Sequence, residues 1–257
     1  DSIIIDEKSF LFFHEREIKN LDWKSVKVDI VIESTGKFKT FEEINQHILA
    51  GAKKVILSAP SEVDEIKTVV LGVNEHILDG SETIISNASC TTNNAAPMIK
   101  IIQEFCEVEQ AYITTIHSYT TDQSLHDQPH KDLRRARGAA QSIVPTTTGA
   151  AKALTKIFPE LEGKIGGCGI RVPVPDGSLT DITFNVKRQV SIEEINQAFK
   201  KAAETNFKGI LDYTEDPIVS VDIIGNQNSC LFDAQLTSVI DKMVKIVGWY
   251  DNEIGYS

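Results

Sequence analysis

The first third of the 257-residue sequence alternates short, β-branched apolar runs with a segment of helical spacing. Four runs have the composition of strands: residues 28–34, 54–58, 69–73 and 83–86. Thr40 is a suitable N-cap for a helix over residues 41–50, whose apolar side chains recur at helical spacing. Alternation of strand and helix implies a mostly parallel sheet with crossover helices, so this part of the chain is predicted to be an α/β unit.

A different pattern begins at Cys90. Residues 91–105 and 149–158 are predicted helices, residues 111–119 a strand, and the polar residues 121–137 a long loop. Alternating strands and a helix capped by Ser191 follow, at residues 181–186, 192–204, 233–239 and 243–247. Such strands indicate an antiparallel sheet with one covered face, which is an α+β arrangement. The domain border is therefore placed just before Cys90.

Charge and cysteine content limit the partners and the compartment. The chain has 26 basic and 37 acidic side chains, and a formal charge of −11 argues against a nucleic-acid or anionic-membrane partner. No apolar run approaches the roughly 18 residues of a membrane-spanning helix. Because the four cysteines are few and contain no CxxC pair, no metal centre is expected and the reducing cytoplasm is the predicted location.

Cys90 is the strongest candidate for chemistry. It lies at the start of a predicted helix, where free backbone N–H groups and the helix dipole favour a thiolate, which is a strong nucleophile. The alternative is a small buried thiol. That structural role is the one expected for the other three cysteines, Cys106, Cys168 and Cys230.

His117 lies in the predicted strand 111–119 and shares a face with apolar side chains. It is either a hydrogen-bonded core residue or the partner of Cys90 in a thiolate–imidazolium pair. The remaining histidines occupy polar stretches and are expected at the surface: His14, His47, His76, His126 and His130.

Basic side chains form a local cluster although the net charge of the chain is negative. Arg134, Arg135 and Arg137 occupy three of four positions in the long loop, and residues 146–149 then open a helix with hydroxyl and N–H groups that suit an anion. Arg171 is a charge within an apolar run and needs an anionic partner. The alternative is that these arginines form salt bridges, within the chain or between subunits, which is the role expected for Arg137.

Six segments, in order along the chain, resemble the phosphorylating glyceraldehyde-3-phosphate dehydrogenase family: residues 86–93, 115–120, 129–137, 145–152, 171–173 and 249–257. The first of them, Ser-Asn-Ala-Ser-Cys-Thr-Thr-Asn, resembles the nucleophile motif of that family. One motif alone would be weak, but six in register cover essentially the whole chain.

The resemblance implies an NAD-dependent enzyme of glycolysis that oxidises glyceraldehyde 3-phosphate to 1,3-bisphosphoglycerate. Cys90 would attack the aldehyde, His117 would act as base while hydride passes to NAD, and inorganic phosphate would cleave the thioester. Thr120 and Arg171 would hold the phosphate of the substrate, with Asp122 orienting Arg171. The attacking phosphate would be held by Ser89, Thr91, Arg135, Thr148 and Gly149. The cofactor site would be lined by Ser34, Thr35, Gly36, Ser58, Ala59, Asn252 and Tyr256.

The resemblance also implies a partial NAD-binding, Rossmann-like domain over residues 1–88, a catalytic domain over 89–247, and a return segment to the NAD domain over 248–257. The sequence contains no GxGxxG fingerprint. The chain is therefore expected to lack the first βαβ unit and to be truncated at both ends. A homotetramer is implied as well.

Some positions depart from the family. Asn94 stands where the family often has a second cysteine. Pro129 matches the residue found in the members of the family that prefer NAD rather than NADP, although Gln128 replaces the leucine that usually precedes it. Two alternatives remain open: erythrose-4-phosphate dehydrogenase, which has closely similar motifs, and an inactive truncated fragment that serves as an interaction module.

Overall fold

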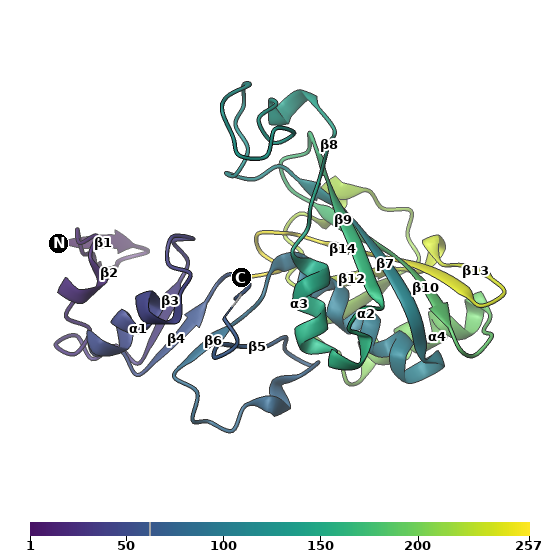
Figure 1. The fold of residues 1–257 in the computed structure, drawn as a ribbon, viewed down its shortest axis with the longest axis horizontal. Helices are drawn as coiled ribbons and strands as arrows, with labels where there is room; N and C mark the ends of the chain where they lie inside the picture. Colours follow the sequence, from purple (N-terminus) through teal and green to yellow (C-terminus); the bar gives the residue numbers. More distant parts are fainter. Residues whose placement is uncertain (62) are drawn as a thin grey trace. The chain divides into compact units, whose positions relative to one another are not determined.

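The computed structural model describes residues 1–61 and 63–257, which form two compact units (Figure 1). The first unit comprises residues 1–68 and 76–87, and the second comprises residues 69–75 and 88–257. Residues 248–257 belong to the second unit, and residues 248–250 are the end of a long strand of its sheet.

The first unit is built on a four-stranded sheet in the order β3-β4-β6-β5, and each pair of neighbouring strands is parallel. Its strands are β3 (Ile30–Glu33), β4 (Lys54–Leu57), β5 (Lys67–Thr68) and β6 (Ile84–Ser86). Helix α1 (Phe41–Leu49) connects β3 to β4 and begins at the predicted cap, Thr40, whose hydroxyl accepts a hydrogen bond from the Glu43 N–H. A hairpin of β1 (Ser2–Ile5) and β2 (Lys8–Leu11) precedes this sheet. The predicted parallel α/β arrangement is confirmed.

The strand predicted over residues 69–73 is wrong. These residues form turns in the second unit, where the Val73 N–H donates to the Val70 carbonyl and the Val70 N–H donates to the Asn74 side chain. Local hydrogen bonds of this kind compete with a strand ladder, so the apolar β-branched run does not join the sheet.

The second unit contains an eight-stranded sheet in the order β11-β12-β14-β10-β7-β9-β8, with β13 paired to β14. The strands are β7 (Val108–Ser118), β8 (Val144–Thr146), β9 (Ile165–Val172), β10 (Ser178–Val186), β11 (Leu211–Thr214), β12 (Cys230–Asp233), β13 (Ser238–Ile240) and β14 (Met243–Tyr250). The sheet is mixed rather than purely antiparallel, because β7–β9 and β11–β12 are parallel pairs.

The continuous strand predicted over residues 233–239 is also wrong. Strand β12 ends at Asp233, whose carboxylate accepts the Gln235 N–H and caps a short 3-10 turn over Ala234–Leu236. The chain resumes as β13 only at Ser238. A side-chain cap therefore interrupts a run whose alternation alone favours a strand.

Three helices lie on one face of this sheet (Figure 1): α2 (Cys90–Cys106), α3 (Ala150–Ile157) and α4 (Ile192–Glu204). The core between them is one apolar cluster that includes Met98 and Ile102 from α2, Phe184 from β10 and Phe199 from α4. The predicted Ser191 cap of α4 is present as a capping box. Among the described helices none is long and apolar enough to cross a membrane.

Gly177, in the turn before β10, is expected to be the glycine whose replacement costs most stability. Its φ is +89°, and an added Cβ would lie 2.3 Å from the Ser220 carbonyl oxygen. Gly177→Ala should therefore combine left-handed strain with a backbone clash and lower the free energy of unfolding by about 2–4 kcal/mol in urea denaturation. Gly163→Ala is the matched control, because φ is +72° there but no atom lies within 4 Å of the added Cβ. Equal losses in the two variants would contradict the clash.

Candidate active site

Cys90 is the first residue of α2, one position earlier than the sequence predicts. The Ser89 hydroxyl caps this helix by accepting the Thr92 N–H at 3.2 Å. The thiol therefore sits in the first helical turn, where backbone N–H groups are not used within the helix and the dipole is positive. The predicted position of Cys90 at the start of a helix is confirmed, and its role as a nucleophile stays a prediction.

His117 brings an imidazole to this thiol. It lies near the end of β7, is only 8% exposed, and places its Nε2 atom 3.4 Å from the Cys90 Sγ atom. The two residues are 27 positions apart in the chain. The thiol and the imidazole are thus within reach of direct proton transfer.

Arg171 fixes the other side of this imidazole. Strands β7 and β9 pair in parallel with His117 opposite Arg171, and the Arg171 Nη1 atom lies 2.6 Å from His117 Nδ1 and 2.9 Å from the Ser118 carbonyl oxygen. Nδ1 also lies 2.8 Å from the Ser118 carbonyl oxygen, so this carbonyl and the guanidinium favour opposite tautomers of the ring. The contact to the guanidinium is the shorter one, and because a guanidinium only donates hydrogen bonds, Nδ1 acts as the acceptor in this state. The ring proton of the neutral imidazole is therefore on Nε2, facing the thiol.

Burial and charge act on the ionisation of this pair. Burial, followed by the positive charge of Arg171, lowers the pKa of His117 to about 4. Burial raises the pKa of the Cys90 thiol, although hydrogen bonds from Thr91 oppose this shift. Both shifts favour the neutral forms in the resting pair, because desolvation penalises the charged forms. The thiolate–imidazolium pair, one of the two alternatives open from the sequence, stays a prediction.

Asp122 has a different partner from the one expected. Its carboxylate pairs with the Arg135 guanidinium and lies 3.5 Å from His130 Nε2, rather than hydrogen-bonding Arg171. Arg135 also donates to the Thr146 hydroxyl at 2.9 Å from its Nε atom. Asp122 therefore positions Arg135, and the predicted orientation of Arg171 by Asp122 is wrong in this state of the site.

The residues predicted to hold an attacking phosphate fall into two groups. Thr148 and Gly149 stand at the start of α3, where the Thr148 hydroxyl accepts the Ala150 N–H at 3.2 Å. The Ser89 hydroxyl lies 2.8 Å from the Thr92 hydroxyl, and the Thr91 hydroxyl lies 2.9 Å from the Tyr250 hydroxyl. The hydroxyls of Ser89 and Thr91 thus make internal hydrogen bonds. The phosphate-binding roles of these four residues and of Arg135 stay predictions.

Arg137 and two cysteines behave as the sequence indicates. Arg137 forms an exposed ion pair with Asp127 at 2.8 Å. Cys106 and Cys230 are buried in the core, and burial raises the pKa of Cys106 to about 11. Cys168 is half-buried on β9.

His47 contradicts the prediction that it lies at the surface. It is only 4% exposed, and its Nε2 atom is 3.0 Å from the Glu33 carboxylate. The prediction fails because its partner lies on another element of the first unit, 14 residues earlier in the chain.

The predicted cofactor-lining residues are found in both units. In the first unit, β3 and β4 are parallel with Glu33 opposite Leu57, so residues 34–36 and 58–59 emerge at the same edge of the sheet. In the second unit, Tyr256 donates its hydroxyl to the Ala88 carbonyl at 3.1 Å. Carboxyl ends of parallel strands are where such sheets bind ligands, so the first group fits a nucleotide.

Asn252 is held by two serines that sequence patterns do not reveal. The hydroxyls of Ser118 and Ser178 both donate to the Asn252 Oδ1 atom at 2.8 Å, and the Ser118 N–H donates to the Ser178 hydroxyl. With Oδ1 occupied in this way, the amide presents its NH₂ group as the donor. A donor fits the carboxamide oxygen of a nicotinamide, so Asn252 suits the predicted cofactor.

Asn94 is a second residue whose role the sequence does not reveal. Its side-chain amide donates to the backbone carbonyls of Trp249 at 3.0 Å and Ser229 at 3.4 Å. Asn94 lies one helical turn after Cys90, so these bonds tie the reactive turn of α2 to the end of β14. Only a pairing between residues more than 100 positions apart could have indicated this.

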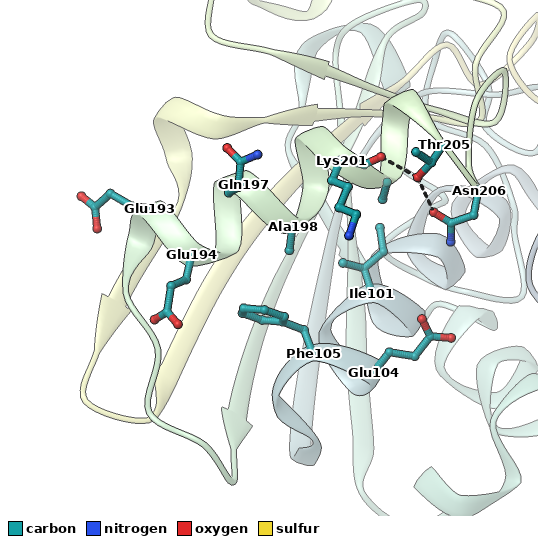
Figure 2. A pocket seen from close by; sticks show the side chains of 11 residues that line it. Ile101, Glu104, Phe105, Glu193, Glu194, Gln197, Ala198, Lys201, Thr205 and Asn206 are labelled. Atoms are coloured by element: carbon teal, nitrogen blue, oxygen red, sulfur yellow. Dashed lines mark hydrogen bonds between the residues drawn. The ribbon is translucent and has the colours of Figure 1, made fainter.

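A separate hollow of about 780 Å³ lies between α2 and α4 (Figure 2). Apolar side chains such as Phe105 and Ala198 form its floor, and Glu104, Glu194 and Lys201 stand around it. None of the residues predicted for the active site lines it.

A parallel α/β unit followed by a unit with a half-buried thiol beside a buried imidazole and an arginine is typical of an enzyme with a thiol nucleophile. Sequence comparisons narrow this class. Residues 89–252 match the family model described as the C-terminal domain of glyceraldehyde 3-phosphate dehydrogenase, and residues 1–41 match its NAD binding domain. The chain belongs to the glyceraldehyde 3-phosphate dehydrogenase family.

Individual relatives agree with this assignment. Glyceraldehyde-3-phosphate dehydrogenase 2 of Streptomyces avermitilis is 53% identical in an alignment that covers the whole of this chain and 77% of the relative. Glyceraldehyde-3-phosphate dehydrogenase 2 of Bacillus subtilis is 49% identical, again over the whole chain and over 76% of the relative. A Mycobacterium avium glyceraldehyde-3-phosphate dehydrogenase is 55% identical over 92% of this chain and 70% of its own length. The NAD-binding match identifies NAD as the cofactor.

Proposed function

We propose that this protein catalyses the phosphorylating oxidation of glyceraldehyde 3-phosphate in glycolysis, with Cys90 as the nucleophile. The observation that carries the proposal is the 3.4 Å contact between Cys90 Sγ and His117 Nε2 at the start of α2. Membership of the family is the reason for naming glyceraldehyde 3-phosphate and inorganic phosphate as the substrates and NAD as the cofactor. A cytoplasmic location and a homotetrameric assembly are part of the same proposal, and sedimentation of the purified protein tests the assembly.

The first chemical step joins Cys90 to the aldehyde. Its Sγ atom bonds to the carbonyl carbon, the thiol proton moves to His117, and the imidazolium then protonates the new oxygen to give a hemithioacetal. His117 removes that proton again as the carbon loses hydride and becomes a thioester. NAD supplies the hydride acceptor when it is bound. An oxygen of inorganic phosphate then attacks the thioester carbon, the C–S bond breaks, and the products are an acyl phosphate and the Cys90 thiolate.

His117 can accept the thiol proton only if its Nε2 atom is unprotonated. In the resting site Arg171 occupies Nδ1 and so places the ring proton on Nε2. A substrate phosphate bound by Arg171 would draw the guanidinium from Nδ1. The proton could then reside on Nδ1, which lies 2.8 Å from the Ser118 carbonyl oxygen, and Nε2 would become the base. Binding of the phosphate end of the substrate would thus prepare the nucleophile.

The purified protein is expected to form NADH from glyceraldehyde 3-phosphate continuously only when inorganic phosphate is present. Without phosphate, the thioester has no acceptor, so NADH formation should stop after about one equivalent for each active chain. The absorbance of NADH measures both phases. Continuous turnover without phosphate would argue against thioester cleavage by phosphate, and a clear preference for erythrose 4-phosphate would favour the alternative enzyme.

A further inference from the structure

A chain of buried hydrogen bonds in the first unit ends at the loop after β3. Glu33 is the last residue of β3 and is 3% exposed. One of its carboxylate oxygens, Oε1, accepts both the N–H of Thr35, at 2.9 Å, and the Thr35 hydroxyl. The other oxygen, Oε2, lies 3.0 Å from His47 Nε2 on α1. A single buried carboxylate therefore joins helix α1 to an exposed loop.

The direction of the protons in this chain follows from Trp23. Its indole Nε1–H lies 3.1 Å from His47 Nδ1 and can only donate. His47 must therefore accept at Nδ1 and carry its proton on Nε2, which donates to Glu33. Glu33 accepts hydrogen bonds at both carboxylate oxygens, as an ionised carboxylate does. Burial alone would raise the pKa of Glu33, but the hydrogen bonds from His47 and Thr35 outweigh this effect and hold the pKa below its ordinary value.

This arrangement restricts the loop of residues 34–36. If the loop moved away, Glu33 would keep its charge in the interior while losing both hydrogen bonds from Thr35, and an unsatisfied buried charge is costly. The resting loop is therefore fixed before any ligand arrives. A binding loop that is already ordered loses less conformational entropy when its ligand binds.

We propose that Glu33 and His47 are positioning residues, which hold residues 34–36 in the conformation that receives the NAD cofactor. The proposal rests on the proposed function, because those residues line the cofactor site only if the protein is the NAD-dependent enzyme described above. Neither residue is expected to touch the cofactor, since both side chains are buried.

Glu33→Gln is the sharpest test because glutamine has the shape of glutamate but replaces one accepting carboxylate oxygen with a donating NH₂ group. If its NH₂ group faces His47, the ring must move its proton to Nδ1, where it opposes the Trp23 N–H. If the NH₂ group faces Thr35 instead, it opposes the N–H of Thr35. Either orientation leaves two donors facing each other, so the dissociation constant for NAD in calorimetry should rise about 10-fold.

Trp23→Phe provides a rescue that a general loss of stability would not give. In the double variant, the introduced glutamine amide can donate to His47 Nε2 without conflict, because no indole N–H remains at Nδ1. Part of the lost NAD affinity should therefore return. A double variant that binds NAD no better than Glu33→Gln would overturn the proposed direction of the protons and, with it, the positioning role.

Hydrogen exchange of the Thr35 amide, without NAD, supplies a second reading. Exchange should become faster in Glu33→Gln and recover in the double variant.

Thr40→Ala is the matched control, because it removes the cap of α1 without changing any of the residues Trp23, His47, Glu33 and Thr35 that form the hydrogen-bond chain. An equal loss of NAD affinity in Thr40→Ala, or unchanged Thr35 exchange in Glu33→Gln, would overturn the proposal. The exchange experiment needs no NAD, so it decides the positioning role even where the wild-type chain, which contains no GxGxxG segment, binds NAD too weakly to measure.

Discussion

Replacing Cys90 with serine is expected to lower kcat for the oxidation of glyceraldehyde 3-phosphate by roughly 10⁴-fold or more, because the reaction loses its nucleophile. A serine hydroxyl is far harder to ionise than a thiol. The features that assist Cys90, namely the first turn of α2 and an imidazole 3.4 Å away, are too weak to replace that difference. The rate of NADH formation measures the loss.

Intact-protein mass spectrometry distinguishes a missing nucleophile from a damaged site. Mixed with aldehyde and NAD but no phosphate, the wild-type protein should gain the mass of the acyl group, whereas Cys90→Ser should not. Cys168→Ser is the matched control. Cys168 is half-buried on β9, and because it lies three residues before Arg171 its side chain faces the other side of the sheet. An acyl adduct on Cys90→Ser would disprove the assignment of the nucleophile.

The parts of the site that local sequence patterns can predict are those set by neighbouring residues. Cys90 is recognisable because a capping serine and a helical run place it in a first helical turn. Thr40 and Ser191 are identified in the same way, from a hydroxyl followed three residues later by a glutamate. Each of these signals spans only a few residues.

The parts that the sequence does not reveal depend on how distant segments meet. His47 resembles a surface residue in the sequence because nothing near it is its partner, whereas in the fold it lies between Trp23 and Glu33. The support of Asn252 by Ser118 and Ser178 likewise brings together three segments of the second unit. A pattern of residue types carries no information about such pairings until strand order and register are known.

The misplaced strands have a related cause. Residues 69–73 and 233–239 both have the apolar or alternating composition of strands, and in both cases a side chain accepts a backbone N–H and turns the chain. Asn74 and Asp233 make those bonds. Composition describes what a strand needs, but it does not show which backbone groups are already satisfied locally.

Methyl phosphate is expected to make Cys90 more reactive toward iodoacetamide if binding of an anion by Arg171 prepares the nucleophile. This small anion could occupy Arg171 without covering the thiol. Neutralising the guanidinium, or drawing it from His117 Nδ1, should raise the pKa of His117 above its resting value of about 4 and stabilise the imidazolium beside a thiolate. The charge of Arg171 lowers the pKa of the Cys90 thiol, so its neutralisation alone would oppose thiolate formation. The new imidazolium, in contact with Sγ, replaces that charge. The pH profile of alkylation should therefore move to lower pH by about one unit, which is a tenfold gain in thiolate at a fixed pH.

Arg171→Met should remove this response and raise KM for glyceraldehyde 3-phosphate on the order of 100-fold, as expected when a charged hydrogen-bonding partner of a phosphate is lost. Arg137→Met is the control, because its exposed ion pair with Asp127 lies outside the contacts of His117. A response that persisted in Arg171→Met would place the anion at another basic side chain, such as Arg135. A profile that methyl phosphate left unmoved in the wild-type protein would mean that Arg171 stays on Nδ1, and His117 could not then accept the thiol proton at Nε2.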